Sequence, residues 1–194
     1  QFFGFLNKQY NEVGWFYCGT GCNTPDRYVT YNYVEQSWAI GLLERTAWLD
    51  EGIVAFPRAA GKVSSTPYLY QHETGNDNDG SPMDNVYIES ADFDIGDGEQ
   101  FQFIRRMIPD VKFTGNGGTG QQINVVLKQR NYPGDSLSTD QTTSFTASTT
   151  KIDMRARARQ AALRFESDDD ASSGVRAGVG FRVGATRLDL QPNG

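Results

Sequence analysis

The sequence of 194 residues has almost no helical periodicity, a single histidine and only two cysteines. A helix that spans a membrane needs about 20 mostly apolar residues, and no run of that kind is present. There is no Gly-x-Ser-x-Gly motif and no second histidine to complete a metal pair. These absences remove the usual signatures of nucleophilic and metal-dependent catalysis. We therefore expect no enzymatic activity, no cofactor and no metal ion.

Positive charge is also in short supply, since 18 Lys and Arg stand against 24 Asp and Glu, for a formal net charge of -6. Both the part before and the part after Met83 are acidic. Proteins that bind nucleic acid by neutralising phosphates are usually basic. The overall composition therefore argues against a general nucleic-acid binder, and an acidic balance favours solubility.

Aromatic residues and glycine are plentiful, at 12% and 21 residues. Aromatic and β-branched residues suit strands, and glycine suits tight turns. Short runs of this composition alternate with turn signals in the first half of the chain. They predict strands over residues 1–6, 12–17, 27–33, 37–42, 52–56 and 68–72. Short strands at intervals of about ten residues predict an all-β protein, either a sandwich, a barrel or propeller blades.

A polar loop over residues 75–82 marks the best domain boundary, and the strands after it are longer. Residues 99–113 predict one strand with a buried face of odd-numbered apolar residues, to which Arg105 is the exception. That face comprises Phe101, Phe103, Met107, Val111 and Phe113. Ile123, Val125 and Leu127 repeat the period of two, which indicates one buried and one solvated face. A glycine-rich turn over residues 115–120 joins the two strands.

The Arg-rich segment from Met154 to Phe165 is predicted to be strand, because its apolar residues alternate and their parity changes once, at Gln160. The closing segment does the same at Gly184: Val175, Ala177, Val179, Phe181 and Val183 are odd, whereas Leu188 and Leu190 are even. A change of parity inside a strand is what a bulge or bend produces. We therefore predict bulges or bends near Gln160 and Gly184.

Three polar features are candidate sites, and each has a structural interpretation beside the functional one. For His72 the functional interpretation is a general base or metal ligand, and the structural interpretation is a histidine that only packs and forms hydrogen bonds. An acidic stretch contains Asp92, Asp94, Asp97 and Glu99. Its structural interpretation is a hairpin turn at residues 96–98, and its functional interpretation is a calcium site, although the spacing does not match the EF-hand pattern. Cys18 and Cys22 are reduced thiols at a hairpin end, a small-loop disulfide or half of a metal site.

Arg155, Arg157 and Arg159 alternate, so they are predicted to share a strand face with Lys151 and Asp153. Three interpretations of such a row compete. The arginines pair with acidic residues of the same chain or of a neighbouring subunit, they form a solvated face, or they contact DNA phosphates. These three arginines are the candidate subunit-interface or DNA-facing residues. Carboxylate pairs suited to glycoside hydrolysis are not singled out by any pattern.

The order of several strings resembles the C-terminal part of tail hub or nozzle proteins of short-tailed bacteriophages, also labelled packaged-DNA stabilisation proteins. The strings are Asn-Glu-Val-Gly-Trp-Phe-Tyr from Asn11, Asp-Arg-Tyr-Val-Thr-Tyr-Asn-Tyr from Asp26, Trp-Ala-Ile-Gly from Trp38, Arg-Thr-Ala-Trp from Arg45, Tyr-Gln-His-Glu from Tyr70, Asp-Phe-Asp-Ile-Gly-Asp-Gly from Asp92, Pro-Asp from Pro109, Arg-Ala-Arg-Gln from Arg157, and Leu-Asp-Leu-Gln-Pro-Asn-Gly from Leu188. The resemblance extends over nearly the whole chain. Two positions depart from the pattern: Ala158 stands where glycine is expected, and Phe181 where a tryptophan is expected nearby.

This resemblance implies propeller blades over residues 1–83, at the end of a longer propeller, and a β-sandwich-like domain over residues 84–194. It also implies a virion protein of the tail, assembled in the host cytoplasm and present in several copies around the DNA channel below the portal. Its partners would be other copies of itself, the tail adaptor or portal, fibre or spike proteins, and genomic DNA without sequence specificity. Because residues 1–6 already form a predicted strand, we expect the native chain to begin earlier.

Two other functions fit the composition. A receptor- or glycan-binding β-sandwich of a virion would expose tryptophans in a shallow groove, which makes Trp15, Trp38 and Trp48 the test residues. A glycosidase would place two carboxylates opposite each other in a cleft.

Overall fold

The computed structural model describes residues 1–52, 54–81, 83, 86–115, 121–168 and 179–193. The fold is all-β, as predicted, and the described elements are antiparallel strands with one short 3-10 turn, Lys8–Tyr10. The chain divides into two compact units, Gln1–Thr74 and Gly75–Gly194, so the division lies at the start of the predicted polar loop. Among the described residues, no helix has the length and apolarity needed to cross a membrane.

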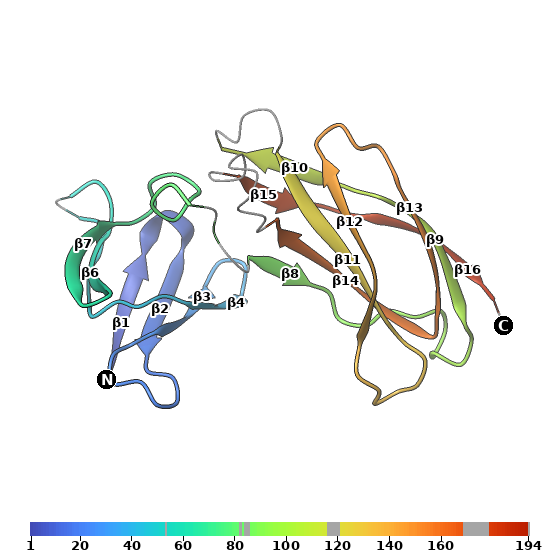
Figure 1. Ribbon diagram of the computed structural model, residues 1–194, viewed down its shortest axis with the longest axis horizontal. Coiled ribbons are helices and arrows are strands. Elements are labelled where there is room, and N and C mark those ends of the chain that lie inside the picture. Colours follow the sequence, from blue (N-terminus) through green and yellow to red (C-terminus); the bar gives the residue numbers. More distant parts are fainter. Residues whose placement is uncertain (53, 82, 84–85, 116–120, 169–178, 194) are drawn as a thin grey trace. The chain divides into compact units, whose positions relative to one another are not determined.

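The first unit contains two antiparallel sheets whose strands follow one another in chain order (Figure 1). The four strands of the larger sheet are β1 (Phe2–Asn7), β2 (Glu12–Tyr17), β3 (Arg27–Asn32) and β4 (Ser37–Leu42). The smaller sheet contains β5 (Ala47–Leu49), β6 (Arg58–Val63) and β7 (Thr66–Gln71). The strands predicted over residues 27–33 and 37–42 are confirmed as β3 and β4, which form a hairpin, and Gln36 adopts the positive φ that its tight turn requires.

An aromatic cluster joins the two sheets of the first unit. The ring of Trp48, on β5, lies 4.7 Å from that of Phe5 and 5.7 Å from that of Phe16, measured between centroids. Gly14 leaves room for the Phe5 ring, because a Cβ at that position would lie 2.3 Å from it. One face of the β1–β4 sheet is thereby buried against β5.

The strand predicted over residues 52–56 is wrong, since the described residues of that segment form bends between β5 and β6. Gly52 and Pro57 enclose the segment, and both residue types disfavour a regular strand. The strand lies instead at β6, whose sequence Arg-Ala-Ala-Gly-Lys-Val has little β propensity. Its register is set by pairing with β5 and β7 on its two sides.

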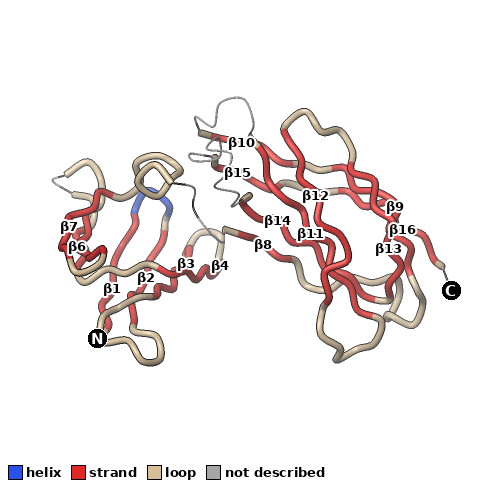
Figure 2. The backbone as a smooth tube through the Cα atoms, viewed as in Figure 1, coloured by secondary structure: helices blue, strands red, loops and turns tan. Residues whose placement is uncertain are grey.

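The second unit has two principal sheets and a two-stranded ribbon (Figure 2). One sheet has the order β12-β11-β14-β8, with β8 (Tyr87–Glu89), β11 (Gln122–Arg130), β12 (Ser138–Thr146) and β14 (Gln160–Ser167). The other has the order β13-β9-β16, with β9 (Gln102–Ile108), β13 (Ile152–Ala158) and β16 (Arg187–Pro192). The ribbon pairs β10 (Val111–Thr114) with β15 (Gly180–Val183).

Both principal sheets contribute to one apolar core, so the unit has the layered arrangement of a sandwich. Ile123, Val125 and Leu127 of β11 are fully buried, which confirms the face predicted for that strand. They pack with Met154 of β13 and Phe165 of β14. Phe181, Val183, Leu188 and Leu190 lie against this core and confirm the parity expected on either side of Gly184. Val175, Ala177 and residues 116–120 lie outside the described residues.

Both predicted changes of parity are confirmed as bends at which the chain leaves one sheet and enters another. β13 ends at Ala158 and β14 begins at Gln160, so Arg159 alone connects the two principal sheets. Between β15 and β16, residues 184–186 belong to no strand, the N–H of Thr186 donates to the Gly184 carbonyl at 3.0 Å, and the two flanking strands pair in different sheets. On the neighbouring strand pair, β9 and β10 are separated only by Pro109 and Asp110.

The prediction for residues 99–113 is wrong in two respects. The segment forms two strands, and the buried side chains of β9 are Gln102, Ile104 and Met107, not Phe101 and Phe103. The register against both β13 and β16 shifts at Arg105, which marks a β-bulge. The bulge changes the parity, so Phe103 faces outward while Met107 faces the core as predicted.

Candidate functional site

The predicted arginine row lies on the outer face of the β13-β9-β16 sheet. Arg155 and Arg157 are exposed and share one face of β13, because Ile152, Met154, Ala156 and Ala158 fill the opposite, buried face. Arg159 does not share that face, because it occupies the bend after the strand. The structure thus places two of the three arginines together.

Phe101 binds the end of this row through its ring. The guanidinium carbon of Arg157 lies 3.8 Å from the Phe101 centroid, and that of Arg159 lies 5.1 Å from it. Arg159 also lies 5.8 Å from the centroid of Tyr132. Cation–π contacts of this kind contribute about 0.5–1 kcal/mol at exposed sites. They hold the two guanidinium groups without neutralising them, and in the described part of the chain neither arginine forms an ion pair.

Further charged side chains surround the arginine row on the same sheet face. Arg106 and Asp189 form an ion pair at 3.1 Å across β9 and β16. Lys151, which immediately precedes β13, lies 3.9 Å from Asp153 of that strand, and both are exposed. The sequence pattern did not identify Arg105 as part of this surface, although it stood out as the exception to the expected alternation.

A second candidate surface is the face of the β1–β4 sheet that points away from Trp48. The register aligns on this face the apolar residues Phe2, Leu6, Val13, Trp15, Val29, Tyr31, Trp38, Ile40 and Leu42. Trp38, Ile40 and Leu42 are 64%, 75% and 74% exposed. Single exposed apolar residues are common, but a contiguous set across four strands usually marks an interaction surface.

The tryptophans proposed as test residues have different environments. Trp38 is exposed, and its ring lies 4.6 Å from Tyr31 and 6.4 Å from Trp15 between centroids. Trp15 and Trp48 are half-buried. Burial of all three would have removed the main support for a glycan-binding surface, and the exposure of Trp38 leaves that support in place.

His72 is held as a neutral acceptor in the first unit. Its Nε2 accepts a hydrogen bond from Nε of the buried Arg45 at 3.0 Å, and its ring lies 4.7 Å from that of Trp48. Burial lowers the pKa of His72 to about 4, with a further contribution from the Arg45 charge. Nε2 is thereby engaged in a contact with a cation, and these contacts support the structural interpretation of His72.

The acidic stretch of the second unit forms the predicted turn, and two of its four carboxylates, Asp92 and Asp94, have protein partners. Asp92 forms an ion pair with Arg130. Asp94 Oδ2 accepts a hydrogen bond from Gln160 Nε2 at 3.3 Å. Gly96 and Gly98 adopt positive φ in the turn. Within the described residues, no group of three or more His, Cys, Asp or Glu side chains is placed to hold a metal ion.

The two cysteines lie in the connection between β2 and β3 as free thiols. Cys22 Sγ donates to Asp26 Oδ2 at 3.3 Å, and Cys18 Sγ donates to the carbonyl of Gln1 at 3.4 Å. The hydrogen bond to Asp26 raises the pKa of the Cys22 thiol. Asp26 also accepts the backbone N–H of Gly19 at 2.6 Å, which lowers the pKa of its carboxyl.

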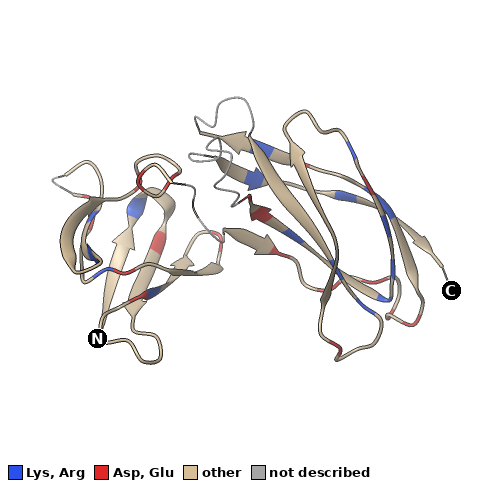
Figure 3. Ribbon diagram, viewed as in Figure 1, with Lys and Arg blue, Asp and Glu red and all other residues tan. Residues whose placement is uncertain are grey.

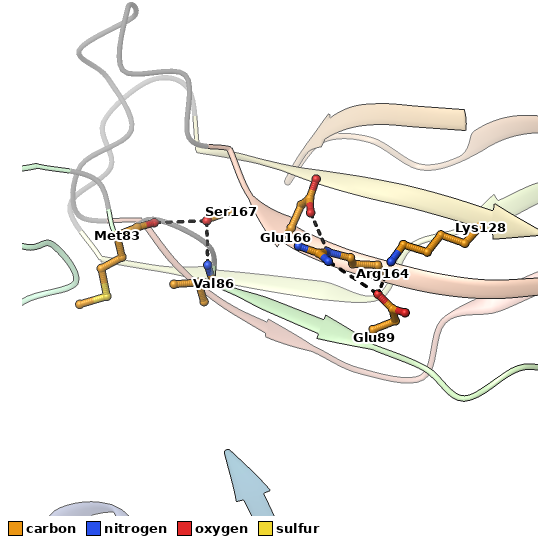
Figure 4. A network of polar contacts seen from close by, with 7 residues as sticks. All are labelled: Met83, Val86, Glu89, Lys128, Arg164, Glu166 and Ser167. Carbon is orange, nitrogen blue, oxygen red and sulfur yellow. Dashed lines mark hydrogen bonds and ion pairs between the residues drawn. The ribbon is translucent and has the colours of Figure 1, made fainter. Parts of the chain in front are cut away.

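A charged network fixes the short edge strand β8 (Figure 4). Glu89 Oε2 lies 2.6 Å from Lys128 Nζ and 3.7 Å from Arg164 Nη1. Glu166 lies 2.7 Å from Arg164 Nε. These groups are only partly exposed and each lies within ion-pair distance of an opposite charge, so the network is a structural feature of the edge strand.

A scan against family models and a search of curated proteins find no match to this chain.

Proposed function

We propose that this chain is a structural protein of a short-tailed bacteriophage tail, part of the hub or nozzle that lines and closes the DNA channel below the portal. In this role the protein retains packaged DNA and guides its ejection. It acts by steric closure in a ring of identical subunits, without enzymatic activity or a cofactor. It is assembled in the host cytoplasm and located in the virion tail.

The observation that carries the proposal is the pair of faces on the β1–β4 sheet. Propellers are built from four-stranded antiparallel sheets that pack against one another around a central channel. The β1–β4 sheet has four antiparallel strands in chain order and apolar residues on both faces. One face packs against β5, while the other exposes Trp38, Ile40 and Leu42.

A sheet with one covered and one exposed apolar face supports the assignment of the first unit as blades at the end of a propeller. The exposed face would then pack against a further blade of the same kind. Burying an apolar side chain contributes roughly 1.5–3 kcal/mol, so a set of this size would hold such a contact firmly. The ordered strings that resemble tail hub proteins support the same proposal independently.

Immunogold labelling of purified phage particles with an antibody to this chain tests the location. Label confined to one vertex, at the tail, is the expected result. Label spread over the head, or particles that carry none, would rule out a tail hub or nozzle.

A variant tests the role of the exposed apolar face. Ile40→Gln with Leu42→Gln should leave the first unit folded, because both side chains are exposed, but should exclude the chain from particles. Lys62→Gln, on the exposed end of β6, is the matched control and should be incorporated normally. Equal incorporation of the two variants would show that this face takes no part in the assembly contact.

The cluster of Trp38, Tyr31 and Trp15 favours a second candidate, a receptor- or glycan-binding module of a virion. Aromatic rings at an exposed surface bind sugars through their apolar faces. Binding to a glycan array that Trp38→Ala abolishes, on a particle labelled away from the tail channel, would favour this function over the first.

A further inference from the structure

We propose that the outer face of the β13-β9-β16 sheet binds the phosphate backbone of duplex DNA without reading its sequence. This inference rests on the proposed function for the source of the DNA and adds the surface that contacts it. The face carries six cations and two carboxylates in a chain whose formal net charge is -6. The cations are Arg105, Arg106, Lys151, Arg155, Arg157 and Arg187, and the carboxylates are Asp153 and Asp189. Lys and Arg recur along these strands in Figure 3.

The β-bulge at Arg105 places two consecutive arginines on this face. Ile104 and Met107 both point into the core, so the two residues between them, Arg105 and Arg106, point outward. A regular strand would have turned one of them inward. The bulge therefore adds a cation to the surface, as bulges elsewhere redirect a side chain at a functional position.

Arg105 and Arg155 form a like-charged pair across β9 and β13. Asp153 pairs with Arg106 and Ala156 with Ile104, so Arg155 lies within the register shift opposite Arg105. Both are exposed, and among the described residues neither has an ion-pair or hydrogen-bond partner. Like charges opposite each other on one sheet face are destabilising. A bound anion would remove this cost, and a violated local rule of this kind is typical of a functional site.

The nearest carboxylates do not neutralise that pair. Asp189 is engaged by Arg106, and Asp153 by Lys151. Arg157 stacks on Phe101 and keeps its charge. An uncompensated set therefore remains, made of Arg105, Arg155, Arg157 and Arg187. Guanidinium groups bind phosphate oxygens through two parallel N–H donors, which suits them to a nucleic-acid backbone.

The composition of the face favours nucleic acid over an acidic protein. Protein interfaces usually contain a core depleted in charge, with large apolar anchors in pockets. Here the outward-facing large apolar side chains are Phe101 and Phe103, which are half-buried, and Ile108, which is 44% exposed. The six cations outnumber them. Protein–DNA interfaces are more polar and far more positive. Arginine side chains already cover the ring of Phe101, so this ring offers no free face on which a nucleotide base could stack. The expected contact is therefore with the phosphate backbone of DNA.

The acidic remainder of the chain limits the strength of this contact. A net negative charge repels DNA at a distance, while a local cationic face attracts phosphates within about a Debye length, roughly 8–10 Å. Binding should consequently be weak, strongly dependent on salt and equal for different sequences. Such a contact would hold DNA beside the protein without stopping its passage.

Fluorescence anisotropy with the full chain and labelled duplexes of two unrelated sequences tests the inference between about 50 and 200 mM salt. Arg105→Gln with Arg155→Gln removes two exposed, unpartnered charges and should leave the fold intact, as circular dichroism would verify. We expect several-fold weaker binding and a slope of log K against log salt that is shallower by about two. Arg58→Gln with Lys62→Gln, which removes two exposed charges from the first unit, is the matched control and should change the slope little.

Four results would overturn the inference. Three are measured by anisotropy: no binding by the wild-type chain at the lowest salt, an equal loss in the control variant, or a marked preference for one sequence. A fourth is self-association, seen by sedimentation and lost in the Arg105/Arg155 variant, without binding to DNA. That result would assign the face to an acidic surface of a second copy. None of these outcomes depends on the immunogold experiment, so the surface and the tail location can fail separately.

Discussion

The carboxylate of Asp110 lies directly over the backbone of Gly184. Asp110 Oδ2 accepts the N–H of Ala185 at 3.0 Å, and the Asp110 carbonyl accepts the N–H of Gly184 at 2.7 Å. A Cβ at Gly184 would lie 2.4 Å from Oδ2 and 2.7 Å from Cγ. The contact joins the bend between β9 and β10 to the bend between β15 and β16.

Gly184→Ala should therefore destabilise the second unit by about 1–3 kcal/mol, as overpacking does in a close contact. Urea denaturation measures this loss. The double variant Asp110→Ala with Gly184→Ala is the control, because removing the carboxylate removes the clash. Its loss should be smaller than the sum of the two single losses, and additive losses would show that the two residues do not interact.

Glu89→Gln should weaken the edge strand β8. The change leaves Lys128 and Arg164 without their shared carboxylate in a partly buried position, at a cost of about 1–3 kcal/mol. Hydrogen exchange of the β8 and β14 amides should quicken. Asp153→Asn breaks the exposed ion pair with Lys151 and serves as control, with an expected change within about 0.5 kcal/mol. Equal effects of the two changes would contradict this account.

Gln102→Ala should destabilise the bend at Arg159. Gln102 is fully buried, and its Nε2 donates to the carbonyls of Phe93 at 3.1 Å and Arg159 at 3.4 Å. The loss combines a cavity with two lost hydrogen bonds, of which the one to Phe93 leaves a carbonyl that still accepts the N–H of Ala161. About 2–4 kcal/mol is expected from thermal or chemical unfolding. Gln102→Met keeps most of the volume and should lose less. An equal loss in both variants would mean that the hydrogen bonds alone account for the effect.

Acidification should destabilise the first unit through His72. The folded-state pKa of about 4 lies below the usual 6.5, so the unfolded chain takes up the proton first as the pH falls. Stability should therefore fall between pH 6.5 and about 4, and His72 should have no effect above that window. After allowance for solvent screening of a partly exposed ring, the loss is on the order of 1 kcal/mol.

His72→Gln separates this effect from that of neighbouring acids, because glutamine accepts the Arg45 hydrogen bond without titrating. Burial raises the pKa of Glu73 and of Glu12, and protonation of these groups favours the folded state as the pH falls. The variant should show a flatter pH profile than the wild type in denaturation experiments. Parallel profiles would show that His72 is not responsible.

Several elements could be predicted from the sequence because one periodicity governs them. β2 and β4 begin and end where the aromatic runs do, and β11 buries the alternate residues that the pattern selected. The bends at Arg159 and Gly184 were indicated by changes of parity, which record a chain that turns its apolar side to a new layer.

Other elements carry no such signal. β12 has the sequence Ser-Thr-Asp-Gln-Thr-Thr-Ser-Phe-Thr and is held mainly by pairing with β11, and β6 is equally poor in large apolar residues. The candidate basic face has the same limitation. The spacing of Arg155 and Arg157 predicts that they share a face, but their proximity to Arg105 depends on which strand lies beside β13 and on a bulge. Strand order and the bulge are set by tertiary structure and have no local sequence signal.

The single-residue crossing at Arg159 also constrains how the length of this chain can vary. Because β13 and β14 belong to different layers and are joined without slack, inserting or deleting one residue in β13 would turn an entire set of core side chains outward. Natural variants should therefore keep the spacing between Ile152 and Phe165 unchanged. Differences in length should accumulate in surface connections such as residues 131–137.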